Sequence, residues 1–356
     1  FIVEICNLNM KYKLSRAIFI LLLIMSSMMV EGATREESII NFIDEMRVEK
    51  SGYTNQIGDE VNLKSTVNAM YAKSILKSDI NNSLDLLYYF QSLQDETGGF
   101  AGDSDSPVNL ESTIDAVYGL VFLDVNQSQF SNWKIYQYLN ASSLNLLLTT
   151  LNATISINEL TLSNLELWYD YLACSGILGV VPTFPIFELI DEIKKLQYAN
   201  GSYYSLDHAL LSVNILNILG EAPVDSDLAK KYILSHRTSD GAFSDKQNGS
   251  SSMEYTRKSL NALRSFMNLN TLDDKSSISR FIFNQQSSRS GLSEVNQIDV
   301  TIKSTLDGLL ILSYLNELDE LRSPDVVQEV GFITFSWISI ITPIFLSVLW
   351  RLKNAR

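Results

Sequence analysis

A short turn motif recurs along the chain. It reads Gly-Tyr at 52–53, Gly-Gly-Phe at 98–100, Gly-Ser-Tyr at 201–203, Gly-Ala-Phe at 241–243 and Gly-Leu at 291–292. The intervals are about 40 to 50 residues, with one double interval where a copy has degenerated, and periods of this size are typical of repeat proteins. In such proteins each unit buries its apolar face against its neighbours. The sequence therefore predicts about six units.

A column of threonines accompanies the motif. Thirteen residues after the last residue of four copies stand Thr66, Thr113, Thr256 and Thr305. An apolar residue precedes each threonine by three positions, and another follows it by four. This spacing places both on one face of an α-helix. Each unit is therefore predicted to be a helix, a glycine-containing loop and a second helix.

The two predicted helices of a unit differ in polarity. The leading helices, such as 83–94, keep a charged face, whereas the trailing helices are more apolar. This difference predicts two concentric layers with the apolar set inside. We therefore predict an all-α fold, an α/α toroid of twelve helices in about six repeats. Gly99 is expected to allow the turn and Phe100 to fill the core beneath it.

The two ends of the chain carry targeting features. Residues 10–32 combine a basic start, an apolar stretch and a small residue before Ala33, as in a secretory signal peptide. An uncleaved anchor helix is the alternative. The uncharged run 331–350 is long enough to span a bilayer of about 30 Å, and basic residues at 351–356 follow it. These features predict a single-pass type I membrane protein with a transmembrane helix, a cytoplasmic tail and an ectodomain, 33–325, in the ER lumen or outside the cell.

Composition supports this placement and excludes one class of partner. The predicted ectodomain contains N-glycosylation sequons at Asn81, Asn126, Asn140, Asn152, Asn200 and Asn248. The net charge of −14 opposes binding to nucleic acid. Cys174 lies in an apolar run with no histidine nearby, so we expect a buried small hydrophobe rather than a nucleophile.

The segments "QSLQDETGGFAG" and "LESTIDAVYGL" resemble repeats of the prenyltransferase and squalene-cyclase α/α toroid superfamily, in particular of protein prenyltransferase β subunits. The resemblance covers roughly residues 36 to 320. It implies a zinc site of Asp, Cys and His in such enzymes. Matching the threonine columns puts Glu254, Thr256 and Ser304 at those positions, which is not a zinc-binding set. The loop that would hold a prenyl diphosphate offers only Lys246. We therefore expect no metal and no cofactor.

Two other activities of the superfamily also lack their motifs here. Triterpene cyclases use an acid from an Asp-rich motif, of which Asp103-Ser-Asp105 is half. Thioester domains need Cys-Gly-Glu-Gln, and the residues after Cys174 lack Glu-Gln.

Three functional hypotheses follow. The first is a catalytically silent, membrane-anchored toroid that binds a protein partner or a hydrophobic ligand. The second is a divergent prenyltransferase-like enzyme, for farnesyl or geranylgeranyl transfer or terpenoid chemistry. The third is a lumenal glycosidase, which needs two carboxylates facing each other. Carboxylates at or near the starts of the predicted inner helices are the catalytic candidates: Asp115, Asp207, Glu254, Asp299 and Asp307. Their other interpretation is favourable charge at a helix N-terminus.

Overall fold

The computed structural model describes residues 33–125, 133–139, 141–142, 162–179, 186–287, 291–295 and 299–322. Within these, residues 36–320 belong to one compact unit. The predicted signal peptide, transmembrane helix and tail lie outside the described residues. Among the helices that are described, none is long and apolar enough to cross a membrane.

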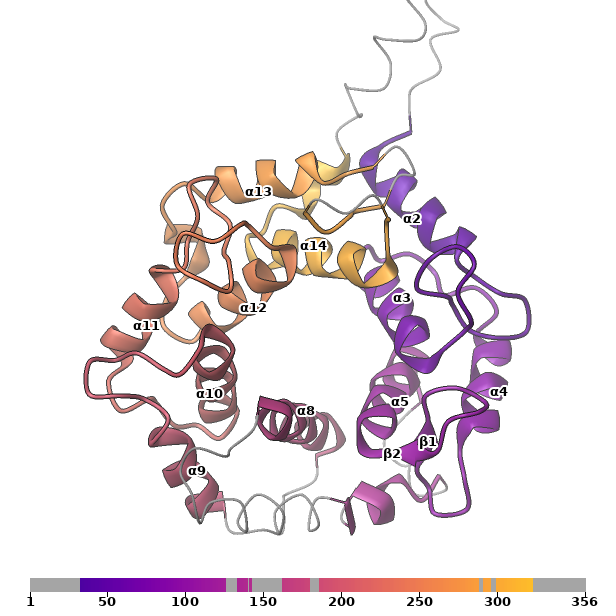
Figure 1. Cartoon of the computed structure of the whole chain (residues 1–356). Coiled ribbons are helices and arrows are strands. Elements are labelled where there is room, and N and C mark those ends of the chain that lie inside the picture. The colour runs from indigo at the N-terminus through magenta and orange to yellow at the C-terminus, as the bar shows by residue number, and fades with distance from the viewer. Residues whose placement is uncertain are drawn as a thin grey trace, which may run out of the picture. The chain divides into compact units, whose positions relative to one another are not determined.

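Within the compact unit, the inner layer is a closed ring of helices (Figure 1). In chain order these are α3 (Leu63–Ile75), α5 (Leu110–Phe122), α8 (Leu162–Leu178), α10 (Leu206–Ile218), α12 (Met253–Leu263) and α14 (Ile302–Tyr314). Each packs against the next, and the last packs against the first. The predicted α/α toroid is confirmed, and its ring closes within the chain.

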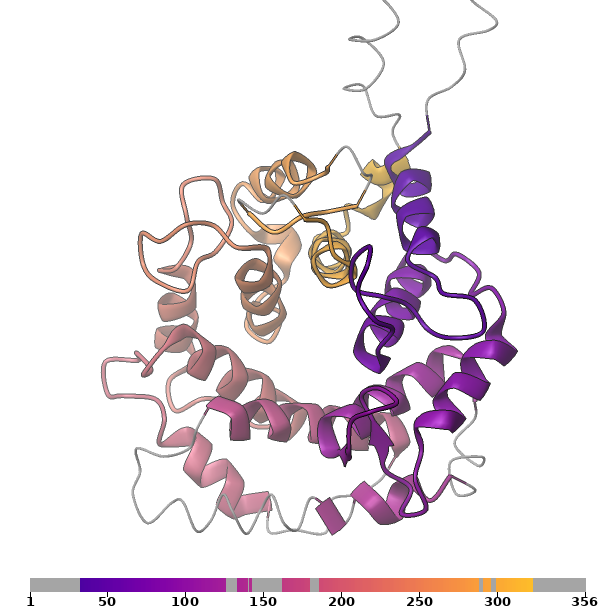
Figure 2. The ribbon, with the colours of Figure 1, turned by 45° about the vertical axis from the view of Figure 1, so that its right-hand side comes forward.

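A second layer of helices surrounds this ring, as the turned view also shows (Figure 2). Its described members are α2 (Arg35–Glu45), α4 (Ser83–Leu93), α9 (Ile186–Lys194), α11 (Ser226–Leu234) and α13 (Lys275–Asn284). The described residues also include two short 3-10 helices, η1 (Leu269–Thr271) and η2 (Leu318–Arg322), and helical residues at 135–139 and 141–142. The outer helices bury one face each, for example Ile39, Phe42 and Ile43 of α2. Their opposite faces keep the charges that the sequence showed.

The repeated turn folds back on the start of the following inner helix. In the second repeat this contact is a short antiparallel pair, β1 (Phe100–Ala101) and β2 (Val108–Asn109), with Phe100 opposite Asn109. Single bridges repeat the pattern between Tyr53 and Asn62 and between Phe243 and Ser252. In these three repeats the partner is the N-cap residue, whose side chain accepts a hydrogen bond from a helix amide.

The threonine column holds these turns in place. The backbone N–H groups of Tyr53, Phe100, Phe243 and Leu292 donate to the Oγ1 atoms of Thr66, Thr113, Thr256 and Thr305 at 2.9, 2.9, 3.0 and 3.1 Å. All four threonines are fully buried. An unpaired buried N–H is costly, so this bond explains the constant offset of thirteen residues. The threonines are structural.

The turn residues are buried as expected. Tyr53, Phe100, Tyr203, Phe243 and Leu292 are each at most 5% exposed. The two glycines before Phe100 are required for different reasons. Gly98 has a φ of +93°, a region that favours glycine, whereas a Cβ on Gly99 would lie 2.5 Å from the ring of Tyr138.

Neighbouring repeats are also linked through the first amides of the inner helices. Leu63 N donates to Gly102 O at 2.8 Å, and Ile302 N donates to Asn55 O at 2.9 Å. The second bond joins the last repeat to the loop of the first. The inner helices therefore begin at one end of the ring, beside the repeated loops.

Candidate functional site: the central cavity

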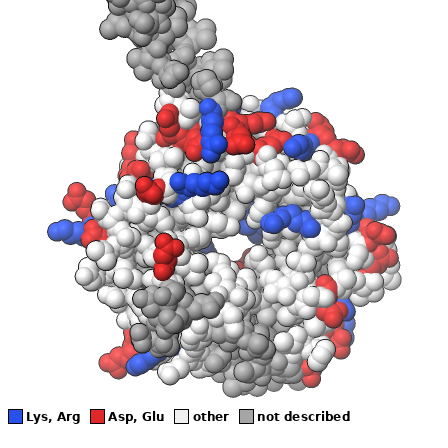
Figure 3. Space-filling model, turned by 180° about the vertical axis from the view of Figure 1, so that it is seen from behind, with Lys and Arg blue, Asp and Glu red and all other residues white. Residues whose placement is uncertain are grey.

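The inner helices enclose a cavity of about 570 Å³ that is lined from all six of them. The space-filling view from behind shows an opening at the centre of the ring (Figure 3). The second residue of every inner helix lines the cavity: Lys64, Glu111, Ser163, Asp207, Glu254 and Lys303. Because these helices begin at the same end, the six side chains form one polar ring, which we call the mouth ring.

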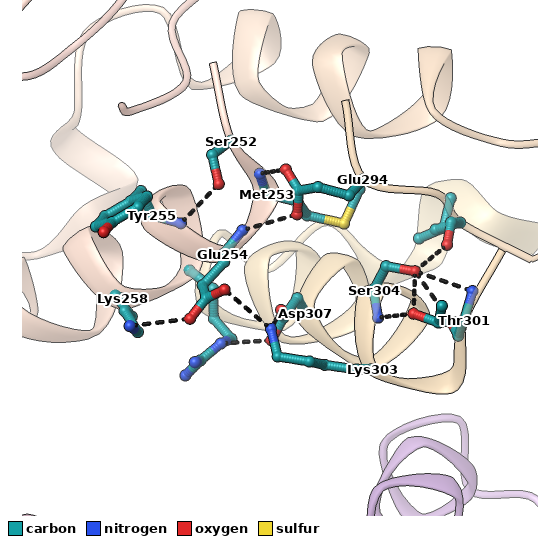
Figure 4. Close-up of polar contacts among 12 residues, drawn as sticks. Ser252, Met253, Glu254, Tyr255, Lys258, Glu294, Thr301, Lys303, Ser304 and Asp307 are labelled. Atoms are coloured by element: carbon teal, nitrogen blue, oxygen red, sulfur yellow. Dashed lines mark hydrogen bonds and ion pairs between the residues drawn. The ribbon is translucent and has the colours of Figure 1, made fainter. Parts of the chain in front are cut away.

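Ion pairs join the mouth ring to the next turn of the helices. Glu254 on α12 lies 2.9 Å from Lys258 Nζ and 3.2 Å from Lys303 Nζ (Figure 4). Lys258 also reaches Asp207 on α10 at 3.2 Å. Lys303 also reaches Asp307 on α14 at 2.9 Å.

Asp307 is the most buried member of this network. It is 3% exposed, and its Oδ1 lies 2.6 Å from Arg257 Nε. We call the whole series the ion-pair chain: Asp207, Lys258, Glu254, Lys303, Asp307 and Arg257. It joins three adjacent inner helices, α10, α12 and α14, and places alternating negative and positive charges along one side of the cavity mouth.

Two neighbouring ammonium groups keep Glu254, in the middle of the ion-pair chain, ionised. Burial raises the pKa of Glu254, but the ammonium groups of Lys303 and Lys258 outweigh this effect and bring the pKa down to about 2. A carboxylate with so low a pKa is a poor general acid. Asp207 is also engaged, because Tyr255 Oη donates to its Oδ2 at 2.8 Å.

The other side of the ring carries two carboxyl groups in a different state: Asp170 on α8 lines the cavity, whereas Asp115 on α5 is not among the residues that line it. Burial raises the pKa of Asp115 on α5 to about 7 and that of Asp170 on α8 to about 6. Lys64 offsets part of this rise, while the negative charge of Glu111 adds to it. Lys64 itself pairs with Glu111 at 2.5 Å. Asp115 and Asp170 are therefore the carboxyl groups best suited to hold a proton near neutral pH.

The structure separates the predicted catalytic candidates. Asp207, Glu254 and Asp307 belong to the ion-pair chain, and Asp115 lies with Asp170 on the other side. Asp299 is exposed and borders a small pocket beside Phe42 and Met46, outside the central cavity.

The residues that the resemblance placed at a zinc site have other partners, and Figure 4 shows those of Glu254 and Ser304. Glu254 is held by two lysines. Thr256 donates to Ser252 O at 2.6 Å and accepts from the amide of Phe243. Ser304 donates to Leu292 O at 2.6 Å and completes a capping box with Thr301.

The histidines and the cysteine of the described residues, whose side chains could in principle bind a metal, have other partners or are buried. His208 Nδ1 lies 2.7 Å from Ser205 Oγ, and His236 Nδ1 lies 3.2 Å from Ser244 O. Cys174 is buried, and burial raises the pKa of its thiol to about 12. In the described part of the chain, no three of the His, Cys, Asp and Glu side chains are placed to share a metal ion.

Sequence reasoning missed Asp170, Arg257, Lys258 and Lys303. Each is a charged residue on a helix that also buries an apolar face. That contrast is a usable signal, because an ionised group on an inner face needs a partner or a cavity. The degenerate third repeat hid Asp170, since it has no turn motif from which to set a register.

We expect stability to fall as the pH rises through the pKa values of Asp115 and Asp170. Both pKa values are raised above the usual range near 4, so the folded state retains protons that the unfolded state has lost. The loss begins near pH 4 and is complete above about pH 7. Asp115→Asn should therefore raise the melting temperature at about pH 8 and change it little at about pH 4. An equal shift at both values contradicts the assignment, and Asp299→Asn serves as the exposed control.

The predicted glycosylation sites are partly within the described residues. Asn81, Asn200 and Asn248 are exposed, so a glycan has room at each. Asn126, Asn140 and Asn152 lie outside the described residues. Occupancy of all six remains a prediction.

Comparisons with known proteins agree with this fold. The family model described as prenyltransferase alpha-alpha toroid domain matches residues 7–86, 74–146 and 188–294. No curated protein sequence matches the chain. Candida albicans protein geranylgeranyltransferase-I, complexed with GGPP, is similar in structure, with a TM-score of 0.59 and 15% identity over 73% of this chain and 85% of that chain.

A second enzyme has a similar fold with a lower TM-score. A single-residue variant of the type II terpene cyclase MstE from Scytonema, in complex with geranylgeranyl dihydroxybenzoate (substrate), has a TM-score of 0.51 and 12% identity over 81% of this chain and 97% of that chain. At such identities the likeness shows the fold alone. The family match spans more than half of the chain, and on that ground the chain belongs to the prenyltransferase α/α toroid family.

Proposed function

We propose that this protein is a binding toroid that does not transfer prenyl groups. One observation carries the proposal: the positions that the resemblance assigns to zinc are engaged in ion pairs and backbone hydrogen bonds. Glu254 binds two lysines, while Thr256 and Ser304 hold the turns of their repeats. Zinc that activates a thiol needs thiolate, imidazole or carboxylate ligands converging on one ion, and neutral hydroxyl groups are poor substitutes.

The cavity fits a bound molecule with a polar end. Charged side chains dominate its mouth, whereas Leu210, Leu306 and Leu310 line it further along the helices. The charged side chains at the mouth disfavour a purely hydrocarbon ligand, because the ligand would have to strip water from these charges or separate the paired ones. A protein segment, or a hydrophobic ligand with a polar head, is able to contact both the charged mouth and the leucine side chains further along the helices.

The proposed cellular setting rests on the sequence. The signal-like residues 10–32, the uncharged run 331–350 and the sequons support a glycosylated ectodomain in the secretory pathway, fixed to the membrane by one helix. A mobility shift on treatment with an N-glycosidase tests lumenal placement. A full-length protein that shows no shift and is digested by protease added to the cytosolic side contradicts it.

We expect the purified full chain to contain no stoichiometric zinc and to leave a cysteine peptide unmodified when given farnesyl or geranylgeranyl diphosphate. The diphosphate leaving group needs several cations, and the lysines that line the cavity are paired with carboxylates. Elemental analysis and mass spectrometry measure the two quantities. One equivalent of tightly bound zinc, or a prenylated peptide, refutes the proposal.

A divergent enzyme is the second candidate, and the raised pKa values of Asp115 and Asp170 favour it. A carboxylic acid that keeps its proton near neutral pH is able to act as a general acid. Turnover of an offered terpenoid or glycoside that is lost in Asp115→Asn and Asp170→Asn, but kept in Asp299→Asn, would support catalysis. Equal turnover in all three variants would remove these two carboxyl groups from the reaction.

A further inference from the structure

A second pocket lies beside the central cavity, between outer helix α11 and the starts of α10 and α12. It has a volume of about 410 Å³, within the range of about 300–1,000 Å³ that is usual for small-molecule sites. Three tyrosines, Tyr204, Tyr232 and Tyr255, line it together with His236. The loop 245–247 forms another wall. We call it the rim pocket, and it shares Asp207 with the central cavity.

Aromatic rings give the rim pocket apolar faces that are fixed by their neighbours. Tyr204 is 80% exposed, although its ring is held edge-on against His208 with centroids 5.4 Å apart. Tyr232 packs similarly against His236 at 5.1 Å. An exposed but positioned tyrosine ring provides a flat apolar surface with a polar rim, and few side-chain torsions are lost when a ligand stacks on it.

Polar atoms around these rings include both donors and acceptors. Ser244 O can only accept, so the hydrogen bond from His236 Nδ1 leaves Nε2 as an acceptor. Burial lowers the pKa of His236, which keeps the ring neutral. Tyr255 Oη donates to Asp207, so its oxygen is able to accept a further bond. Lys246 and Gln247 add donors, and Asp245 adds a carboxylate acceptor.

The charges of the rim pocket largely cancel. Asp207 is paired with Lys258, and Asp245 and Lys246 contribute one lining charge of each sign. A simple anion or cation therefore finds no excess of opposite charge. A neutral ligand with many hydroxyl groups and apolar faces satisfies the mixed donors, the acceptors and the tyrosine rings together. We propose that the rim pocket binds a carbohydrate.

The proposal is tested with the purified full chain after enzymatic removal of its N-glycans. Calorimetric titration uses methyl α-mannoside, maltose and N,N′-diacetylchitobiose as probes. We expect at least one probe to bind with a Kd of about 1 mM or lower, which is weak but measurable. Tyr204→Ala should weaken binding by about tenfold or more, because it removes the exposed ring. Tyr204→Phe should retain binding within about threefold, since stacking does not need the hydroxyl.

Tyr88→Ala is the matched control, because Tyr88 is 65% exposed on α4 and does not line the pocket. It should leave binding unchanged. Failure of all three saccharides to bind, or equal losses in Tyr204→Ala and Tyr88→Ala, overturns the proposal. Tyr204-dependent binding of inorganic phosphate or tetramethylammonium in place of the saccharides also overturns it. Saccharide binding that appears only in Asn248→Gln or deglycosylated protein also supports it.

Discussion

Replacing Asp44 by alanine is expected to lower the free energy of unfolding by about 2–4 kcal/mol, somewhat less than the usual cost of breaking a fully buried ion pair, because the Asp44 side chain is 39% exposed and partly screened by solvent. Its partner, Lys73 on inner helix α3, is completely buried, with Nζ 2.5 Å from Asp44 Oδ1 on outer helix α2. The substitution leaves an ammonium group inside the core without a counter-charge. Urea unfolding followed by circular dichroism measures the change.

The double variant Asp44→Leu with Lys73→Met separates the charge from the packing. It removes both ionic groups and fills their space with apolar atoms, so most of the lost stability should return. Glu45→Ala, an exposed neighbour on the same helix, should change stability by no more than about 0.5 kcal/mol. A loss below about 1 kcal/mol for Asp44→Ala would show that water reaches the Lys73 ammonium group once its partner is gone.

The fold could be predicted because its decisive contacts are local in sequence. In four of the five turns the backbone amide donates to a threonine thirteen residues later, so the register of the turn against its helix is visible as a fixed offset. Two layers followed from helix polarity alone. The offset is absent from the third repeat, and for that reason α8 and its Asp170 had no predicted place in the ring.

The candidate site could be predicted only in part, because its contacts join helices that are far apart in sequence. Asp207, Glu254 and Asp307 were recognised as carboxylates near helix starts. Their partners Lys258 and Lys303 were not, since nothing in the sequence indicates which cation faces which carboxylate across the ring.

Asp299 shows the limit of a positional argument. It too stands near a helix start, yet it precedes the N-cap Thr301 and is exposed. A side chain before the cap does not share the inward direction of the first helical turn, where Lys303 lies.

The ion-pair chain supports the binding proposal, whereas Asp115 and Asp170 support the enzymatic alternative. Charged side chains that are paired with each other hold neighbouring helices together, and their carboxylates are poorly suited to donate a proton. Carboxyl groups with raised pKa values are able to donate one. The binding proposal follows from the first set, and the enzymatic alternative rests on Asp115 and Asp170.

Phe100→Ala is expected to cost about 3–5 kcal/mol, because truncating a fully buried phenylalanine leaves a cavity in a close-packed core. The ring of Phe100 is completely buried and stacks on Trp133 with centroids 5.9 Å apart. It fills the turn of the second repeat, where its own amide is already fixed by Thr113. Urea unfolding of the full chain, followed by circular dichroism, measures the loss.

Two further variants distinguish the ring from the hydrogen bond. Thr113→Val keeps the shape of the threonine but leaves the Phe100 amide unpaired, so it should cost about 1–3 kcal/mol. Phe187→Ala removes the same type of side chain from α9, where it is 80% exposed, and should cost no more than about 0.5 kcal/mol. If Phe100→Ala and Phe187→Ala lose equal stability, the repeated turn is not anchored through its aromatic residue.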